Sequence, residues 1–465
     1  MEKFDVLVIG GGPGGYVCAI KAAQLGHLVA CVDDKEFLGG TCLNVGCIPS
    51  KALLNLTHKY YEASNHFAEY GIEFNNLRFS LQKIMEKKQK IISDLGKGIQ
   101  GLFAKNKITY FNGKGSFFDD GKVAIKLNTG EKKVISAKNI VIATGSEAVS
   151  LPSIKIDEDK IVSSTGALSF NKLPKRLCVI GGGVIGTEMG SIWSRLGSEV
   201  TIIEHAPRLL AGFDDDISRE FQKILEKQGL EFKSSSRVNA IDKRGEILEV
   251  SFTNKDTTEK LECDKVLVSI GRRPYTKDLN LDSIGITLNE KGMIPVDRNF
   301  LTSAKGVYAI GDVIAGPMLA HKSEEEGIAV AEIISGQHGH VNYNTIPSVV
   351  YTSPEVASIG KTEAMLKKEG IEYRVGKFPF LANSRARAMC ETDGFVKILA
   401  SKNTDEILGA HMIGIAAGDL ITEIAVAMEF KAASEDIARI CHAHPGLSEA
   451  VKEAAFAAFF KPIHM

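Results

Sequence analysis

The sequence predicts an α/β fold in which one unit of strand, glycine turn, helix and strand occurs twice and a mixed α+β domain follows. "FDVLVIGGGPGG" (residues 4–15) and "RLCVIGGGVIG" (176–186) each join a short apolar run to a glycine cluster, and an apolar helical stretch comes after each. From about residue 346 onward the chain reads as short strands and helices without a glycine motif. Strands that alternate with helices indicate parallel sheets.

The bulk composition is that of a multidomain globular protein. At about 150 residues per domain, 465 residues suggest roughly three domains. A formal charge of −1 gives no reason to expect nucleic acid or an anionic membrane as a partner. No run approaches the roughly 18 apolar residues that a membrane span needs. The opening "MEKFDVLVIG" enters a strand pattern at once, so we expect neither a signal nor a transit peptide and a cytoplasmic location.

The two glycine clusters both fit GxGxxG, and each is followed by an acid. The acids are Asp33 and Glu204, each 23 residues after the first glycine of its cluster. Glycines let a pyrophosphate approach a helix N-terminus, and the acid accepts hydrogen bonds from ribose hydroxyls. We therefore predict two Rossmann-like dinucleotide-binding domains whose glycines are Gly10, Gly12 and Gly15 in the first and Gly181, Gly183 and Gly186 in the second.

The acids also indicate which dinucleotides bind. Asp33 and Glu204 would repel a 2′-phosphate, which favours FAD and NAD over NADP. Arg208 and His205 lie close to Glu204 in sequence, and a basic residue is what NADP would require. NADP therefore stays open as an alternative for the second site.

The segment between the two units predicts one long helix and a return to the first domain. "LQKIMEKKQKIISDLGKGIQGLFAKN" (81–106) has apolar residues at helical spacing, and a helix docked on the first domain is favoured over a coiled coil. The strands expected around 114–127 and 138–145 then lead back to Gly145. Gly271 ends the second unit in the same way.

"GGTCLNVGCIPSK" (39–51) places Cys42 and Cys47 five residues apart. In a regular helix their Cα atoms would lie about 8 to 9 Å apart, whereas a disulfide tolerates no more than about 7 Å. If the two bond, the helix must be irregular across 41–47, with Gly46 as the place to bend, and regular from about Pro49. A structural disulfide or half of a zinc site are the alternatives, and we favour a redox pair.

A general base for thiol chemistry is expected in "HAHPGLSE" (442–449). His444 has Glu449 five residues later, at the head of the last predicted helix, where a carboxylate can orient an imidazole. The bond between His444 and Pro445 is a candidate cis peptide.

Long stretches of the chain resemble the flavin disulfide reductases, the class I pyridine nucleotide-disulfide oxidoreductases, and within them the dihydrolipoyl dehydrogenase branch. The matching stretches are "GGGPGGY", "GGTCLNVGCIPSK", "ATGS", "GGGVIGTEMG", "GDVIAGPMLAHKSEEEG", "VVYTSPEVASIG", "FPFLANSRARA" and "HAHPGLSE". The resemblance implies FAD on the first unit and NAD on the second. It implies domains at 1–148 (FAD), 149–274 (NAD), 275–345 (completing the FAD site) and 346–465 (a C-terminal dimerisation domain).

The resemblance also implies single residues. On the FAD side these are Lys51, Gly115, Thr144, Gly145, Asp312 and Ala320, beside the glycines and Asp33. On the NAD side they are Glu188, which would pair with Lys51, together with Val238 and Gly271. His444 would be the base, Glu449 its orienter and His442 a bystander. Gly446 departs from the threonine that the family usually has, and Asp33 from the commoner glutamate.

The activity that the resemblance implies is oxidation of protein-bound dihydrolipoamide to lipoamide through a Cys42–Cys47 disulfide and FAD, with reduction of NAD⁺. It implies a homodimer in which His444 of one subunit faces the cysteines of the other. The implied partner is a lipoyl-bearing protein of a 2-oxo acid dehydrogenase complex or the glycine cleavage system. Because the chain starts at the first glycine motif, we expect no fused lipoyl domain. A glutathione- or mercuric-reductase-like enzyme and a non-catalytic flavin redox sensor remain the alternatives.

Overall fold

The computed structural model describes residues 1–119 and 121–465, and the chain divides into two compact units. Unit 1 contains residues 1–53, 80–149 and 271–341. Unit 2 contains residues 54–79, 150–270 and 342–465. Each unit thus joins segments that are far apart in the sequence.

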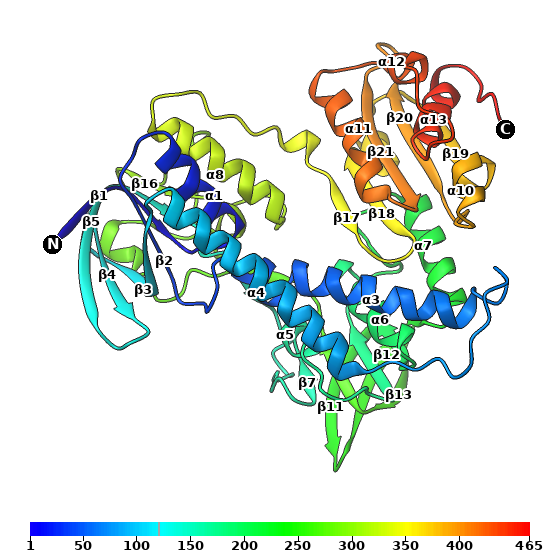
Figure 1. Cartoon of the computed structure of the whole chain (residues 1–465), viewed down its shortest axis with the longest axis horizontal. Helices are drawn as coiled ribbons and strands as arrows, with labels where there is room; N and C mark the ends of the chain where they lie inside the picture. The colour runs from blue at the N-terminus through cyan, green and yellow to red at the C-terminus, as the bar shows by residue number, and fades with distance from the viewer. Residues whose placement is uncertain (120) are drawn as a thin grey trace. The chain divides into compact units, whose positions relative to one another are not determined.

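Unit 1 is built on a sheet whose parallel strands run in the order β3, β2, β1, β5, β16. The long strands β3 and β5 extend beyond this parallel part and pair with β4 as an antiparallel meander, visible at the end of the sheet in Figure 1. The strands are β1 (Glu2–Ile9), β2 (Val29–Asp33), β3 (Thr109–Asp119), β4 (Lys122–Leu127), β5 (Lys132–Ile142) and β16 (Val307–Ala309).

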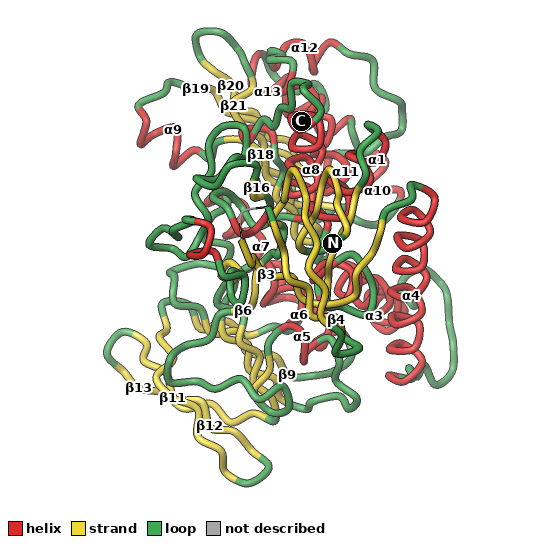
Figure 2. Tube along the Cα trace, turned by 90° about the vertical axis from the view of Figure 1, so that its left-hand side faces the viewer, coloured by secondary structure: helices red, strands yellow, loops and turns green. Residues whose placement is uncertain are grey.

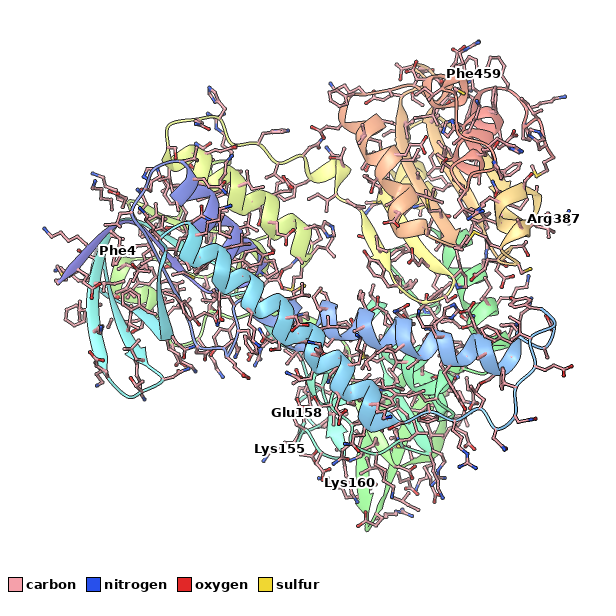
Figure 3. All side chains as sticks on the ribbon, in the orientation of Figure 1. Phe4, Lys155, Glu158, Lys160, Arg387 and Phe459 are labelled. Atoms are coloured by element: carbon pink, nitrogen blue, oxygen red, sulfur yellow. The ribbon has the colours of Figure 1, made fainter. Side chains whose placement is uncertain are left out.

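Apolar strand residues and two close-packed helices form the core of unit 1. Helices α1 (Pro13–Gln24) and α8 (Ala320–Ile334) pack together. A Cβ on Gly327 would lie 2.5 Å from the Gly14 carbonyl oxygen, so this contact requires glycine. On the sheet, the rings of Phe4, labelled in Figure 3, and Phe111 meet edge to face at 6.2 Å.

The long helix predicted over 81–106 is confirmed as α4 (Leu81–Lys105). The Ser80 side chain accepts a hydrogen bond from the Lys83 amide and so caps its N-terminus. Phe103 is buried in the unit 1 core, which anchors the helix as expected. The remaining elements of unit 1 are α2 (Gly40–Val45), the start of α3 (Cys47–Asn65), β6 (Ser146–Ala148), β15 (Arg272–Pro274), and the 3₁₀ turns η1 (Leu281–Ile284) and η2 (Gly311–Val313).

Unit 2 repeats the nucleotide-binding unit with a five-stranded parallel sheet in the order β10, β9, β8, β14, β7. A three-stranded antiparallel sheet, β11 to β13, follows and projects as hairpins in Figure 2. The strands are β7 (Ile161–Val162), β8 (Arg176–Ile180), β9 (Glu199–Ile203), β10 (Glu231–Lys233), β11 (Ser236–Arg244), β12 (Ile247–Asn254), β13 (Thr257–Cys263) and β14 (Lys265–Val268), with helices α5 (Ser164–Ala167), α6 (Val184–Arg195) and α7 (Asp215–Lys227).

The C-terminal part of unit 2 is an antiparallel sheet in the order β17, β18, β21, β20, β19. Helices α11 and α13 cover it and supply apolar residues to one core. The elements are η3 (Tyr343–Thr345), β17 (Ser348–Val350), β18 (Glu355–Gly360), α9 (Glu363–Glu369), β19 (Tyr373–Pro379), η4 (Phe380–Ala382), α10 (Ser384–Ala388), β20 (Phe395–Ser401), β21 (Ile407–Gly414), α11 (Ala417–Glu429), α12 (Ser434–Arg439) and α13 (Glu449–Phe459). Within the described residues, every helix is too short or too polar to cross a bilayer.

Candidate active site

The two glycine turns have the same geometry. Gly10 and Gly181 adopt left-handed φ angles of 106° and 108°. A Cβ on Gly15 would lie 1.8 Å from the carbonyl oxygen of Gly10, and one on Gly186 would lie 2.0 Å from that of Gly181. The first and third glycines of each motif are therefore required by the turn itself.

The middle glycines serve the ligand side of the turns. Gly12 and Gly183 are the N-caps of α1 and α6, and neither helix receives a side-chain cap. A Cβ on Gly183 would meet nothing within 4 Å, so the space in front of the helix is open. Uncapped amides and open space at a helix N-terminus fit an anionic pyrophosphate.

The acid of each copy holds the turn in shape. The Asp33 carboxylate accepts hydrogen bonds from the amides of Gly11 (2.6 Å) and Lys35 (2.8 Å). Glu204 accepts from Gly182 (2.5 Å) and Ala206 (2.6 Å) in the same pattern. Burial raises the pKa of Asp33, although both amides oppose the rise.

Residues predicted for the FAD side lie in unit 1, at the ends of its elements and within its sheet. Gly115 lies in β3, where a Cβ would come within 3.0 Å of the Val32 side chain. The Thr144 hydroxyl donates to the carbonyl oxygen of Tyr275 at 2.6 Å, which ties the end of β5 to the chain after β15. Ala320 is the first residue of α8.

Asp312 lies in the η2 turn, and buried charges hold that turn. Lys322 is fully buried and donates to the Gly311 carbonyl oxygen at 3.0 Å. Glu326, equally buried, accepts from the Gly311 amide at 2.7 Å and pairs with Lys322 at 3.0 Å. Helix α8 thereby fixes the backbone beside Asp312.

Sequence reasoning missed Ser146 and Arg272, which meet at Asp312. The Ser146 hydroxyl donates to Asp312 at 2.5 Å and accepts from Arg272 Nε at 2.7 Å. Burial lowers the pKa of Arg272, while the charges of Asp312 and Cys47 oppose that shift. The sequence shows only that "ATGS" and "SIGRRP" follow equivalent strands of the two repeats, and the pairing of β6 with β15 that brings them together appears only in the structure.

The two cysteines predicted to form the redox pair flank a one-residue break between two helices. Cys42 lies in α2, which ends at Val45, and Cys47 is the first residue of α3. Between them Gly46 leaves the helical region, with φ −143° and ψ −113°. The predicted irregularity is thus confirmed, but it is confined to Gly46, and α3 is regular two residues earlier than expected.

The structure holds the pair as two thiols in hydrogen-bond contact. The hydrogen bond with Cys47 and burial both raise the pKa of Cys42 far above its usual value, and Lys51 opposes them. Cys47 is the first residue of α3, and a helix N-terminus favours a thiolate.

A carboxylate that sequence reasoning did not single out adds to this effect. Glu324 in α8 raises the pKa of Cys42 and accepts a hydrogen bond from the Tyr16 hydroxyl at 3.3 Å. Burial, followed by the charge of Glu324, raises the pKa of Tyr16 to about 12. Both residues lie in quoted motifs, "GGGPGGY" and "HKSEEEG", but a run of three glutamates does not tell which one points inward.

The predicted base and its orienter are in contact in unit 2. His444 Nδ1 lies 3.0 Å from Glu449 Oε1, and the other carboxylate oxygen accepts from the Gly446 amide at 2.9 Å. Burial acts to raise the pKa of Glu449, but the Gly446 amide and His444 outweigh it, so the pKa is lowered. The predicted cis bond between His444 and Pro445 is confirmed.

The residues predicted for the NAD side are spread over three elements. Glu188 is buried in α6 and accepts a hydrogen bond from the Tyr351 amide at 2.9 Å. Val238 is in β11 and belongs to a buried apolar cluster. Gly271 has a left-handed φ of 132° directly before β15. The assignment of these residues to NAD stays a prediction.

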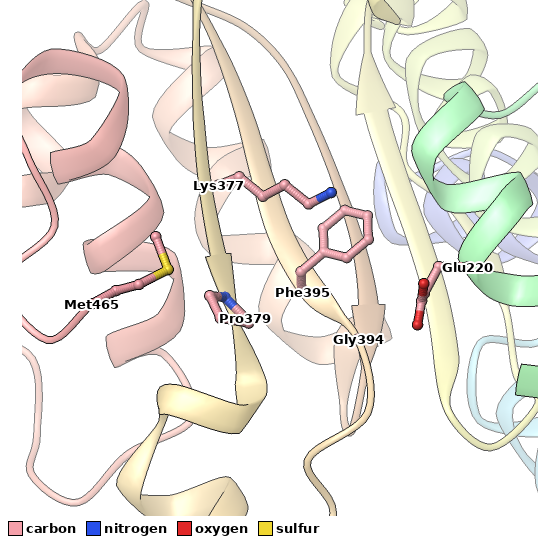
Figure 4. A pocket seen from close by; sticks show the side chains of 6 residues that line it. All are labelled: Glu220, Lys377, Pro379, Gly394, Phe395 and Met465. Carbon is pink, nitrogen blue, oxygen red and sulfur yellow. The ribbon is translucent and has the colours of Figure 1, made fainter.

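A surface hollow of unit 2 lies apart from these residues. It has a volume of about 410 Å³ and is shown in Figure 4. Lys377 Nζ lies 3.7 Å from the centroid of the Phe395 ring at its wall. The residues that line it are Glu220, Lys377, Pro379, Gly394, Phe395 and Met465, and the sequence analysis assigned a role to none of them.

Comparison with known proteins decides the family. Residues 4–327 match the pyridine nucleotide-disulphide oxidoreductase family, and residues 346–455 match the dimerisation domain of the same family. The chain belongs to the pyridine nucleotide-disulphide oxidoreductases. Members of this family bind FAD, depend on NAD(P) and carry the C-terminal domain through which they dimerise.

Individual relatives of this oxidoreductase match over its whole length. It is 53% identical over 466 residues to the mitochondrial dihydrolipoyl dehydrogenase of Pisum sativum, covering 100% of this chain and 93% of that protein. It is 54% identical over 463 residues to a leghemoglobin reductase of Glycine max, covering 99% and 88%. The structure of LpdA from Mycobacterium tuberculosis superposes with a TM-score of 0.91 at 25% identity, covering 98% and 99%. The predicted fold class and the resemblance are confirmed.

The expected cytoplasmic location is wrong. Dihydrolipoyl dehydrogenases from plants, mammals and Dictyostelium discoideum align with at least 98% of the length of this oxidoreductase. These relatives are mitochondrial proteins, which points away from the cytoplasm. The prediction rested on the first ten residues of the chain. A targeting segment is read by a receptor and is independent of the fold, so the first strand of an enzyme carries no information on its compartment.

Proposed function

We propose that this oxidoreductase is a dihydrolipoyl dehydrogenase, which oxidises protein-bound dihydrolipoamide to lipoamide and reduces NAD⁺ to NADH. The observation that carries the proposal is 53% identity to such enzymes over the full chain, combined with two cysteines set on either side of a helix break. The disulfide bond between two cysteines placed in this way can form and break within the folded protein.

The thiol steps follow from the placement of the cysteines. In the oxidised enzyme a substrate thiolate attacks Cys42, forms a mixed disulfide and releases Cys47 as a thiolate. The second substrate thiol, deprotonated in its turn, attacks the first substrate sulfur in that mixed disulfide, and the bond from that sulfur to Cys42 breaks. This step releases lipoamide and Cys42, which takes up a proton. Two electrons now reside on the cysteine pair, and the raised pKa of Cys42 favours the proton on that sulfur.

His444 supplies the proton transfer that these attacks need. Its Nδ1 faces a carboxylate, so Nδ1 carries the proton and Nε2 is left to accept one from a substrate thiol. Glu449 then stabilises the imidazolium that forms. In a homodimer the His444 that serves one cysteine pair would come from the other subunit.

The chain fits FAD on its first nucleotide unit. The uncapped N-terminus of α1 would hold the pyrophosphate, Asp33 the ribose, and the fixed Asp312 turn the ribityl chain, with Lys51, Gly115, Gly145 and Ala320 alongside. When bound, FAD supplies the two-electron carrier between the thiols and the nicotinamide. Arg272 and Ser146 would hold Asp312 in a fixed orientation toward it.

NAD is favoured over NADP on the second unit. Arg208, the residue that could receive a 2′-phosphate, has its Nη2 2.6 Å from Asp215 Oδ1. Glu204 accepts from the glycine-loop amide of Gly182 with one oxygen and from the Ala206 amide with the other, and its charge would repel that phosphate. A basic pocket for NADP would need Arg208 to be released from Asp215.

We further propose that the substrate arrives on a lipoyl-bearing protein of a 2-oxo acid dehydrogenase complex or of the glycine cleavage system. The domain division at 148, 274 and 345 is part of this proposal, because it assigns the first three segments to FAD or NAD and the last to the dimer. A glutathione-reductase-like enzyme would need the basic NADP pocket that Arg208 does not provide. A mercuric reductase would need a second cysteine pair near the C-terminus, where the chain reads "FFKPIHM".

An anaerobic titration of the FAD-loaded protein with dihydrolipoamide tests the proposal. We expect thiolate-to-flavin charge-transfer absorption on reduction and NADH on addition of NAD⁺, with much slower turnover with NADP⁺. The Cys42→Ser variant is the control, since it keeps the fold and cannot form the mixed disulfide. Absence of both the charge-transfer band and NADH would overturn the enzyme function in favour of a redox sensor.

A further inference from the structure

A second histidine beside the base is held more tightly than the base itself. The side chain of His442 is 6% exposed, whereas that of His444 is 69% exposed in the single chain. The family resemblance made His444 the base and His442 a bystander. His442 lies in the segment after α12, and its buried side chain packs against α11 and makes defined contacts.

Both ring nitrogens of His442 face hydrogen-bond acceptors. Nδ1 lies 2.9 Å from the carbonyl oxygen of Ile440, and Nε2 lies 2.7 Å from Glu423 Oε1. A neutral imidazole has one donor and one acceptor, and only the imidazolium donates from both nitrogens. With Glu423 ionised, the two bonds form together only when His442 carries a positive charge.

The same short segment is tied to a second helix. Lys452 Nζ in α13 donates to the Ile440 carbonyl oxygen at 2.8 Å, the same oxygen that His442 Nδ1 faces. Helix α13 also begins with Glu449, which orients His444. The backbone that leads to the base is therefore fixed to α11 through His442 and to α13 through Lys452.

Charged side chains of both signs approach His442, an anion from α11 and a cation from α13. Glu423 faces it from α11, Lys452 reaches the shared carbonyl oxygen from α13, and Cys441 Sγ lies 4.0 Å from the His442 carbonyl oxygen. The charges on α12 pair with each other, Arg439 with Glu435 at 2.6 Å. The short Glu423 contact is the one that directly meets the ring.

We propose that His442, held as an imidazolium by Glu423 and the Ile440 carbonyl group, is a positioning residue that fixes the backbone of the base His444. The proposal rests on the proposed function, in which His444 is the base. Two residues of chain span at most about 7 Å, so a shift of the backbone at His442 also shifts the backbone at His444. A misplacement of about 1 Å at a reacting group can cost about 10²-fold in rate.

Two substitutions separate the charge from the attachment. His442→Ala removes both hydrogen bonds and should lower kcat for dihydrolipoamide oxidation by about 10- to 100-fold, with KM changed less than about twofold. Glu423→Gln keeps both bonds, because its amide can donate to a neutral Nε2 while Nδ1 still donates to Ile440. The Glu423→Gln variant should retain most of kcat, while the His442 ring loses its positive charge.

A matched control excludes a mere loss of stability. His411 is also fully buried in the C-terminal sheet and makes two hydrogen bonds, to Ser358 (2.6 Å) and to the Lys361 carbonyl oxygen (3.0 Å). His411→Ala should lower the unfolding midpoint at least as much as His442→Ala and leave kcat per bound flavin within about twofold. An equal loss of kcat in both variants would overturn the proposal.

A second readout does not depend on turnover. In ¹⁵N-histidine NMR of the FAD-loaded dimer, His442 should carry protons on both nitrogens at pH 7, and Glu423→Gln should convert it to a single tautomer. A neutral His442 ring in the unmodified protein would overturn the charge assignment even if the enzyme is active. A doubly protonated ring in a protein that does not oxidise dihydrolipoamide would instead count against the proposed function alone.

Discussion

At the scale of single residues, the direction of a hydrogen bond decides which atom does the chemistry. In the proposed mechanism Glu449 faces Nδ1 of His444 and thereby leaves Nε2 for proton exchange. The same carboxylate is fixed by the Gly446 amide, so its position does not depend on the histidine alone. An orienter that is itself anchored leaves the imidazole one orientation.

Replacement of the base and of its orienter should therefore have unequal effects. His444→Gln should lower kcat by about 10²- to 10⁴-fold, the range of general base catalysis. Glu449→Gln should cost less, because the amide keeps a hydrogen bond but no longer stabilises the imidazolium. Stopped-flow reduction by dihydrolipoamide measures both, with NADH-driven flavin reduction as the control that neither variant should alter. If Glu449→Gln lowers kcat as much as His444→Gln does, the carboxylate is needed for more than orientation.

Residues with a local backbone signature could be predicted from the sequence, and residues defined by distant contacts could not. Gly10 and Gly181 follow from the turn that each must make, and their acids follow from a fixed spacing. Ser146 and Arg272 acquire their role only where β6 pairs with β15, and these strands are more than a hundred residues apart. Such a contact leaves no periodic trace in the chain.

At the scale of elements, the break between α2 and α3 is sharper than the sequence suggested. The prediction spread the irregularity over residues 41–47, because a disulfide cannot form across a regular helix. The structure places the whole departure at Gly46, where a Cβ would lie 2.8 Å from the Thr41 carbonyl oxygen. One glycine leaves the hydrogen bonds on both sides intact, which a distributed distortion would lose.

Gly46→Ala should therefore impair the cysteine pair and spare the cofactor. The added methyl group collides with the Thr41 carbonyl oxygen and must displace α2 from α3, so we expect dithiol formation to slow by about tenfold or more. Stopped-flow reduction by dihydrolipoamide together with bound-flavin content measures the two effects.

Gly98→Ala is the control for Gly46→Ala. A Cβ there meets nothing within 4 Å, and Gly98 lies on the exposed side of α4. This substitution should raise stability by up to about 1 kcal/mol and leave the thiol kinetics unchanged. Normal reduction kinetics in Gly46→Ala would mean that the break tolerates a side chain.

At the scale of the whole molecule, one buried lysine joins the second nucleotide-binding sheet region to the C-terminal sheet within unit 2. Lys397 in β20 is 1% exposed and donates to Asp214 (2.7 Å), Asp216 (3.1 Å) and Glu363 (2.5 Å). Two of these acids are at the head of α7 and the third begins α9. Burial acts to raise the pKa values of Asp214, Asp216 and Glu363, but the hydrogen bonds from Lys397 outweigh it, and the pKa of Asp216 falls to about 2.

Removal of the lysine should take away the buried cation that the three carboxylates share, while Asp216 and Glu363 keep only their more exposed partners Arg219, Lys377 and Lys367. Lys397→Met is expected to cost about 3 to 5 kcal/mol at pH 7, the usual penalty for breaking a buried ion pair from one side. The control is Lys402→Met, which loses an exposed pair with Glu372 (2.9 Å) and should cost about 1 kcal/mol or less. Urea unfolding followed by circular dichroism and flavin fluorescence measures both.

The pH dependence of the difference between wild type and Lys397→Met has a defined sign. The folded pKa values of the three carboxyls lie below their ordinary values of 3.8 and 4.5, so their stabilisation is complete above about pH 4.5 and is lost as the pH falls toward 2. The raised pKa of Lys397 keeps the lysine charged through that range. A difference between the two proteins that stays constant from pH 7 to pH 3 would contradict this account.

The two repeated parallel sheets could be predicted from the sequence, whereas the pairing between strands of distant segments could not. Two glycine motifs with equally spaced acids were enough to predict two parallel sheets. The return of residues 80–149 to the first domain was predicted from the strands that lead to Gly145, but the partners and register of β4 and β16 depend on long-range pairing that no local pattern encodes. The same holds for the strand order of the C-terminal sheet.

The break at Gly46 has a further consequence for what the protein does over many turnovers. Because the two sulfurs stand on separate helices, closing their bond swings one helix end against the other about a single residue, and neither helix is compressed.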